Sequence, residues 1–282
     1  MSAPRIFRTL AAVAVIGTLA ACSGPADDSG TEPSADATPT YITEGKLTIA
    51  TGEPAYEPYV VDDTPENGEG FESAIAYAVA EELGFGADDV VWVRTGFDEA
   101  IQPGPKTFDF NLQQFTITPE REETVDFSTP YYSTPQAVIT VAGSNGEDAA
   151  SIADLKDLVI GAQTGTTSFT TAETAIAPTA GVQAFNTNDD AKLALQNGSI
   201  DALIVDLPTA FYLTAAELDG GKIIGQLPAT DGVSDEWGLL LDKDSTLTDS
   251  VTDAVNALRD DGSLAEIADQ WLGGEAGAPV LK

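Results

Sequence analysis

Arginine is rare in this chain, and Arg121 occupies a segment suited to binding an anion. Only three arginines follow residue 8, and this one lies in residues 113–132, QQFTITPEREETVDFSTPYY. A guanidinium group offers a planar fork of donors that fits a carboxylate. The arginine follows a predicted strand, residues 107–115, and a hydroxyl-rich turn that begins at Thr116. The segment therefore predicts one half of a site for a small carboxylate, with the chain folded as two lobes around it.

A second turn, rich in threonine, could bind the same anion. It contains Gly165, Thr166 and Thr167 and connects a predicted strand, residues 158–163, to a helix. Free N–H groups and the positive end of a helix dipole favour a carboxylate at such a position. Plain N-capping by Thr166 or Thr167 needs the same residues, so both interpretations remain open. A P-loop is excluded, because no Gly-Lys-Ser/Thr sequence follows.

An aromatic loop follows the first predicted strand, residues 46–51. It contains two prolines, with Tyr56 between them and Tyr59 directly after the second. Tyr59 is expected to pack on the core. Tyr56 is expected to face a ligand, because loops at strand ends in open α/β sheets are where ligands bind, although core packing is the alternative. Asp206 ends an apolar strand, residues 200–205, and precedes a helix, which is also the position of an N-cap.

The composition limits the classes of function. The chain has 282 residues, 46 acidic against 12 basic, 43% hydrophobic content and no histidine. So acidic a surface repels phosphate backbones, which argues against nucleic-acid binding. It is expected to keep the protein in solution, with an acidic docking function as the alternative. Catalysis by Ser-His-Asp or Cys-His groups is excluded, and we expect no metal or cofactor.

The N-terminus predicts export and lipid attachment. Residues 1–21 combine Arg5 and Arg8 with a short apolar run, as in a signal peptide. The run ends in Leu-Ala-Ala before Cys22, the only cysteine, and resembles the lipobox of bacterial lipoproteins. Residues 22–42 are small, acidic and Pro-containing, which predicts a flexible tether. We therefore expect an extracytoplasmic protein held by lipid on Cys22 at the outer face of the cell membrane.

Strands and helices alternate along the rest of the chain, which predicts an α/β fold. Residues 70–83 have apolar positions at helical spacing and end at Gly84, a usual helix stop. We expect lobe 1 to comprise residues 43–135 and 237–275, and lobe 2 to comprise residues 136–236. Two hinge strands are expected to connect them, at residues 136–141 and near residues 234–237. Each lobe should be a mixed sheet flanked by helices.

Several motifs resemble the polar amino-acid family of ABC-transporter solute-binding proteins. The motifs are EPAYEPY at residues 53–59, GF at 70–71, TITPER at 116–121, VDFSTPYY at 125–132 and GTT at 165–167. The resemblance extends from about residue 46 to residue 273 and implies the type II periplasmic-binding-protein fold. There are two departures. Ala74 stands where the family usually has Asp, and the run from Gln113 to Phe115 replaces a more common run of small residues.

The resemblance also implies roles for individual residues. Arg121 would bind the α-carboxylate of an amino acid, with the amides near Thr166 and Thr167. The α-ammonium would be held by Asp206, Thr116 and the backbone at Gln114. Tyr56 would cover the ligand side chain. Glu53 would contact the end of that side chain, although an exposed loop acid is an equal alternative.

The function that follows is capture of a free polar amino acid, with basic amino acids as one candidate class, by closure of the lobes and delivery to an ABC permease. The protein is expected to be a monomer. Two alternatives stay open. One is a dehydratase of the arogenate or prephenate type on the same scaffold, for which Glu53 is the obvious proton-transfer group. The other is a sensory module that presents its ligand to a separate receptor.

Overall fold

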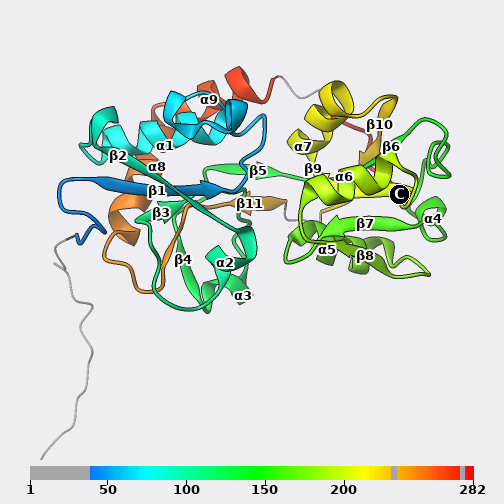
Figure 1. Ribbon diagram of the computed structural model, residues 1–282, viewed down its shortest axis with the longest axis horizontal. Helices are drawn as coiled ribbons and strands as arrows, with labels where there is room; N and C mark the ends of the chain where they lie inside the picture. The colour runs from blue at the N-terminus through cyan, green and yellow to red at the C-terminus, as the bar shows by residue number, and fades with distance from the viewer. Residues whose placement is uncertain (1–38, 230–233, 274–276) are drawn as a thin grey trace, which may run out of the picture. The chain divides into compact units, whose positions relative to one another are not determined.

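The computed structural model describes residues 39–229, 234–273 and 277–282 (Figure 1). The predicted signal peptide, Cys22 and most of the expected tether lie outside these residues. Residues 40–42 of that tether contact the folded part: the amide of Ile42 donates to Asp109, and Tyr41 stacks edge-on against Phe85. Within the described residues, no helix has the length and apolar character needed to span a bilayer.

Lobe 1 contains a five-stranded mixed sheet in the order β2-β1-β3-β12-β4. β1 is parallel to β2 and β3, whereas β12 is antiparallel to β3 and β4. The strands are β1 (Leu47–Gly52), β2 (Val90–Thr95), β3 (Phe110–Asn111), β4 (Val125–Phe127) and β12 (Leu240–Asp242). The helices are α1 (Phe71–Glu82), α2 (Phe97–Ile101), α3 (Pro119–Glu122), α8 (Thr248–Asp260) and α9 (Ser263–Trp271), with 3-10 turns at Val61–Asp63, Pro65–Asn67 and Ala87–Asp89.

The helix predicted at residues 70–83 is confirmed as α1. Its buried positions Phe71, Ile75 and Val79 recur every four residues and pack with α8 and α9 in the main core of lobe 1. Gly70 precedes the helix with φ 106°, and a Cβ there would lie 2.4 Å from the carbonyl oxygen of Tyr59. Only glycine allows this approach, so the residue determines how the preceding loop enters α1.

The predicted strand at residues 107–115 is much shorter in the structure. Only Phe110–Asn111 form ladder bonds with β1 as β3. Before it, the Asp109 carboxylate replaces a strand partner by accepting the amide of Thr48 at 2.6 Å. After it, Gln114 adopts φ 51°, a left-handed conformation that ends an extended chain. The turn that precedes Arg121 therefore begins earlier than predicted.

Lobe 2 contains a second five-stranded mixed sheet in the order β10-β6-β9-β7-β8. The strands are β6 (Gln136–Val141), β7 (Ile160–Gln163), β8 (Val182–Phe185), β9 (Ala202–Asp206) and β10 (Gly221–Gln226). The helices are α4 (Ile152–Leu155), α5 (Thr167–Thr171), α6 (Asn188–Gln196) and α7 (Leu207–Tyr212), and α5 and α7 continue into π-helical turns at Ala172–Ile176 and Leu213–Glu217. Alternate strand residues enter different cores: Leu203 packs with α6 and α7, and Ile204 packs with α4 and α5.

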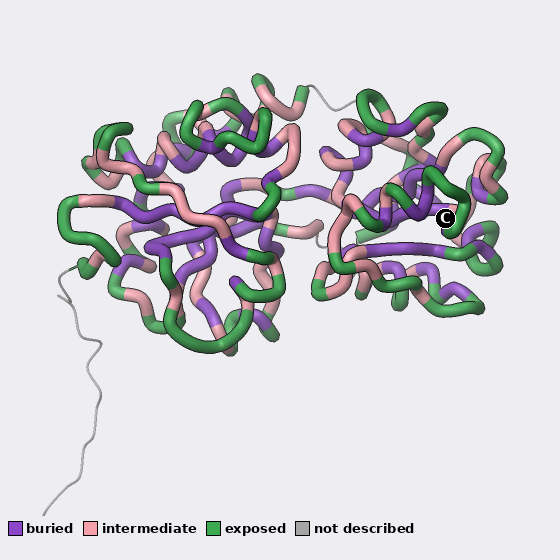
Figure 2. Tube along the Cα trace, viewed as in Figure 1, coloured by how far each residue is buried: buried purple, intermediate pink, exposed green. Residues whose placement is uncertain are grey.

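The two sheets are connected by a two-stranded antiparallel ribbon, formed by β5 (Tyr132–Thr134) and β11 (Asp235–Trp237). The return crossing near residues 234–237 is confirmed. The outward crossing is not at residues 136–141, because these form β6 in the lobe 2 sheet. Pro135, which has no N–H, separates the ribbon strand from β6. Purple, buried segments run through both sheets in Figure 2. The fold is the type II periplasmic-binding fold.

Candidate functional site

One cavity of about 250 Å³ lies where loops of the two lobes meet. All eight ligand-site residues predicted from the sequence line it: Glu53, Tyr56, Gln114, Thr116, Arg121, Thr166, Thr167 and Asp206. They come from the loop after β1, the segment after β3, the start of α3, the turn after β7 and the end of β9. Segments more than 150 residues apart in the sequence are thus brought to one place by the fold.

Arg121 lies in the four-residue helix α3, whose N-cap Thr118 accepts the Arg121 amide. The side chain donates from Nη1 to the carbonyl of Thr116 at 2.6 Å and from Nη2 to the carbonyl of Gly165 at 2.9 Å. Only 8% of the residue is exposed, and among the described residues it has no carboxylate within ion-pair distance. Burial lowers its pKa from the ordinary value. A buried guanidinium that makes no direct ion pair provides an attractive position for an external anion.

Asp206 is one of the acidic residues of the cavity. It stands at the N-cap position of α7, but its side chain makes no capping hydrogen bond, so the capping interpretation is not supported. Instead, Gln136 donates from Nε2 to Asp206 at 2.6 Å and to Asp235 at 2.5 Å. Burial and the nearby Asp235 raise the pKa of Asp206 to about 8. A cation placed beside this carboxylate would favour its ionised form.

The two threonines after β7 have different contacts. Thr166 is the N-cap of α5: its Oγ1 accepts the amide of Phe169 and donates to the carbonyl of Gln163. Thr167 lies 3.2 Å from the Thr116 hydroxyl of the other lobe and donates to Asp235 at 2.7 Å. Capping by Thr166 is therefore real and coexists with a place on the cavity wall, whereas Thr167 contributes to contact between the lobes.

Glu72 lines the cavity but was not predicted as a site residue from the sequence. It lies at the second position of α1 and is 1% exposed. It accepts the Gln114 amide at 2.8 Å, the Gln114 side-chain amide at 2.5 Å and the hydroxyl of Tyr131. Burial raises the pKa of Glu72 to about 7 against these donors. An acid at an otherwise apolar helix start was the available signal, and these bonds support the left-handed conformation of Gln114.

Tyr56 and Tyr59 both line the cavity, and Tyr59 also packs in the core of lobe 1, as expected. Tyr59 is 2% exposed, packs edge-on against Trp237 and shares a 2.8 Å hydrogen bond with Thr209 of lobe 2. Tyr56 is half-buried on the cavity wall, and burial together with Asp189 raises its pKa to about 12. Glu53 lines the cavity and is exposed, so it keeps contact with solvent.

Phe97 is a second residue that sequence reasoning missed. It begins α2, lines the cavity and stacks on Phe115 with ring centroids 4.8 Å apart. The Arg121 guanidinium carbon lies 5.4 Å from the centre of its ring. An aromatic at a helix start is usually a core residue, so nothing local distinguished this one. The described residues hold no cluster of three or more acids that could bind a metal ion.

Comparison with known proteins agrees with this geometry. Residues 47–274 match the model of bacterial extracellular solute-binding proteins, family 3. The chain belongs to this family. As a member of an extracellular family, it functions outside the cytoplasm. One relative, the L-arginine-binding protein of Pseudomonas aeruginosa, is 30% identical over 242 residues, covering 83% of this chain and 90% of the relative.

Two solved structures have the same fold. An ancestral arginine-binding protein bound to glutamine superposes with a TM-score of 0.68 at 30% identity, covering 82% of this chain and 99% of the other. The ancestral amino acid-binding protein AncCDT-1, described as a precursor of cyclohexadienyl dehydratase, gives a TM-score of 0.67 at 28% identity and covers 81% and 95%. These relatives of the solute-binding protein are named for binding arginine or amino acids, and one of them is described as the precursor of an enzyme.

Proposed function

We propose that the protein captures a free amino acid between its lobes and delivers it to an ABC permease. The observation that carries this proposal is Arg121, a buried guanidinium without a carboxylate partner among the described residues, in a cavity that also contains Asp206. An α-amino acid supplies both missing charges. Its carboxylate pairs with the arginine fork, and its ammonium pairs with Asp206. The two groups belong to different lobes, so one ligand favours closure of both.

The remaining residues complete the recognition of the α-groups. Thr116 and the backbone at Gln114 assist Asp206 at the ammonium, and the amides at Thr166 and Thr167 assist Arg121 at the carboxylate. Closure excludes water, which strengthens each of these polar contacts. Because every amino acid has these α-groups, they provide affinity without selecting a side chain.

The charge of the cavity supports a basic side chain. Besides Arg121, the charged residues of the lining are all acids: Glu53, Glu72, Asp98, Glu99 and Asp206. Once the α-groups have used Arg121 and Asp206, only negative charge remains for the side chain. A cationic end is favoured in such a field. Relatives named for arginine support the same class. Tyr56 would cover the aliphatic part of the ligand, with Glu53 at its end.

The manner of attachment is part of the proposal. Lipid on Cys22 would hold the protein at the outer face of the membrane, with the residues after it as a tether. The protein would act as a monomer, since a single chain supplies every wall of the cavity. Metabolic labelling with a radioactive fatty acid tests the anchor: Cys22→Ala should remove the label and release the protein into the medium. A labelled variant would refute lipid attachment at this residue.

Thermal-shift screening of the purified protein against free amino acids tests the central proposal. Arginine, lysine and ornithine should raise the melting temperature most, because ligand at a hundredfold excess over Kd stabilises the folded state by about 2.7 kcal/mol. Arg121→Ala should abolish the shift while the variant still unfolds cooperatively. Arg259→Ala removes the same side chain from α8, away from the cavity, and should keep the shift. A protein that no amino acid stabilises would contradict the proposal.

A dehydratase remains a second candidate because of one observation. Glu72 and Asp206, with pKa values raised to about 7 and about 8, could transfer protons near neutral pH, and AncCDT-1 is related to an enzyme. Glu53, the group expected from the sequence, is exposed. Incubation with prephenate and arogenate decides between the two functions: product formation that Asp206→Asn abolishes would favour the enzyme, and no product would favour the binding protein.

A further inference from the structure

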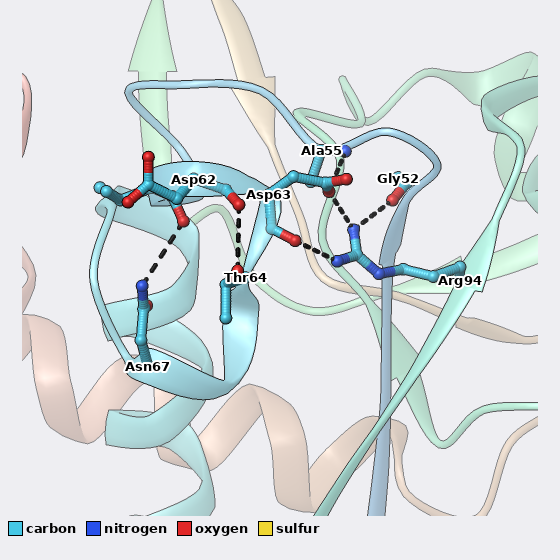
Figure 3. A network of polar contacts seen from close by, with 8 residues as sticks. Gly52, Ala55, Asp62, Asp63, Thr64, Asn67 and Arg94 are labelled. Atoms are coloured by element: carbon cyan, nitrogen blue, oxygen red, sulfur yellow. Dashed lines mark hydrogen bonds and ion pairs between the residues drawn. The ribbon is translucent and has the colours of Figure 1, made fainter.

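The loop that carries Glu53 and Tyr56 is held at both ends by one polar network (Figure 3). Before Glu53, the carbonyl of Gly52 accepts a hydrogen bond from Arg94 Nη1 at 2.8 Å. Two residues after Glu53, the amide of Ala55 donates to Asp63 Oδ1 at 2.9 Å. The two backbone groups therefore lie on either side of Glu53 and are tied to one arginine and one aspartate.

Arg94 and Asp63 are in turn joined to each other. Arg94 Nη1 donates to Asp63 Oδ1 at 2.6 Å, and Nη2 donates to the Asp63 carbonyl at 2.6 Å. Arg94 lies on β2, so the guanidinium extends from the rigid sheet of lobe 1. A planar fork can donate at once to the Gly52 carbonyl, to Asp63 Oδ1 and to the Asp63 backbone carbonyl. A single ammonium group cannot do this in the same geometry.

The segment that presents Asp63 has an unusual backbone. Asp62 and Asp63 have φ values of 54° and 50°, so two consecutive non-glycine residues are left-handed. Such conformations persist only where the surroundings impose them. Contacts within the turn contribute: the Thr64 hydroxyl donates to the carbonyl of Asp62 at 3.0 Å. The hydrogen bond from Arg94 to the Asp63 carbonyl adds a contact from outside the turn.

We propose that Arg94 and Asp63 are positioning residues that set the selectivity of the site for the ligand side chain. Neither lines the cavity of about 250 Å³. Asp63 lines a second cavity of about 180 Å³ that shares Tyr56 and Gln114 with the first, so the affinity test uses Arg94, which lines neither cavity. Arg94 and Asp63 act through the loop between Gly52 and Tyr56. This inference rests on the proposed function, since it assigns to that loop the contact with the side chain.

The binding energy has two parts, one from the α-groups of the ligand and one from its side chain. The α-groups of the ligand are held by Arg121 and Asp206, which lie on α3 and β9 and share no hydrogen bond with Arg94. Loosening the loop therefore weakens contacts with a long side chain and leaves contacts with the α-groups intact. The readout is the ratio of the Kd values for L-arginine and L-alanine, not the affinity for either one.

Arg94→Lys is the main variant, because it keeps the charge and removes only the fork. We expect the Kd for L-arginine to rise about tenfold, the equivalent of one charge-assisted hydrogen bond, and the Kd for L-alanine to change less than about twofold. In Arg94→Gln, the direction of the change in arginine affinity distinguishes an effect of charge from an effect of positioning. Removing a positive charge makes the field more acidic and should tighten arginine binding, whereas the loss of positioning weakens it. Arg259→Lys is the matched control and should change neither Kd.

Hydrogen exchange of the Ala55 amide, measured without ligand, tests the network independently of binding. Exchange should accelerate about tenfold in Arg94→Lys and in Asp63→Ala, while amides of α8 keep the wild-type rate and so report an intact fold. Unchanged Ala55 exchange, or tighter arginine binding by Arg94→Gln, would overturn the inference. If the wild type binds no amino acid, the proposed function fails, and the effect on Ala55 still decides whether the two residues position the loop.

Discussion

The pH dependence of ligand affinity follows directly from the environment of Asp206. In the ligand-free protein, burial and the neighbouring Asp235 raise the pKa of Asp206 to about 8. The proposed complex needs the ionised carboxylate, because only this form pairs with the α-ammonium. Binding at a pH below 8 must therefore release a proton. Affinity should rise with pH until Asp206 is ionised before the ligand arrives.

The size of the effect can be worked out from that pKa. A group with a pKa of about 8 is about 1% ionised at pH 6 and about half ionised at pH 8. The apparent Kd should consequently fall about fiftyfold between these two values, equivalent to about 2.3 kcal/mol. The ligand contributes little to this change, since its α-ammonium stays protonated over the range.

Isothermal titration calorimetry with L-arginine at pH 6, 7 and 8 measures both predictions. Repeating the pH 6 titration in two buffers of different ionisation enthalpy counts the protons, and about one should leave per ligand bound. Asp206→Asn has no titrating group and should show a weaker, flatter profile. The difference between the two profiles isolates Asp206 from Glu72, which also titrates in the cavity. A wild-type Kd that is the same at pH 6 and pH 8 would refute the pairing of Asp206 with the ammonium.

Three further predictions concern stability and the cavity wall. The pKa of Asp206 is higher in the folded protein than its ordinary value of 3.8, so the free energy of unfolding without ligand should fall as pH rises from about 4 to 8. In urea unfolding, Asp206→Asn should therefore exceed the wild type in unfolding free energy by about 1 kcal/mol or more at pH 8 and by little at pH 4. Gly70→Ala should lower the unfolding free energy by about 3 kcal/mol, since its Cβ would meet the Tyr59 carbonyl at 2.4 Å; a wild-type urea midpoint would contradict this. Phe97→Ala should weaken arginine binding about tenfold through loss of the ring beside Arg121, and an unchanged Kd in a folded variant would remove Phe97 from the site.

Local patterns in the sequence predicted most of the elements correctly. The helix at residues 70–83 matches α1 to within one residue at each end, because apolar spacing and flanking glycines act within the segment itself. The predicted length of the third strand, residues 107–115, was wrong because of a tertiary contact. The Asp109 carboxylate satisfies the amide of Thr48 where a strand would have used its backbone, and a sequence pattern does not record such a substitution.

The roles of the site residues were only partly readable from the chain. Position and chemistry suggested a carboxylate site at Arg121, since a fork of donors in a hydroxyl-rich turn has few other uses. Whether Asp206 caps a helix or faces a ligand could not be read from its position before α7. In the structure the side chain makes no capping bond, accepts a hydrogen bond from Gln136 and lines the cavity, and its contact with a ligand stays a prediction.

Residue types and short-range spacing by themselves indicated the α/β alternation and a carboxylate site at the arginine turn, and the family resemblance added Glu53, Gln114 and Thr116 to the predicted cavity residues. Only the tertiary structure decided how these residues are held. Glu72 supports Gln114 across 42 residues of sequence, and Arg121 reaches Gly165 across 44. Such pairs depend on the packing of separate elements, and burial in that packing is also what raises the pKa values of Glu72 and Asp206. Local sequence specifies which groups are present, and the fold sets their partners and their solvation.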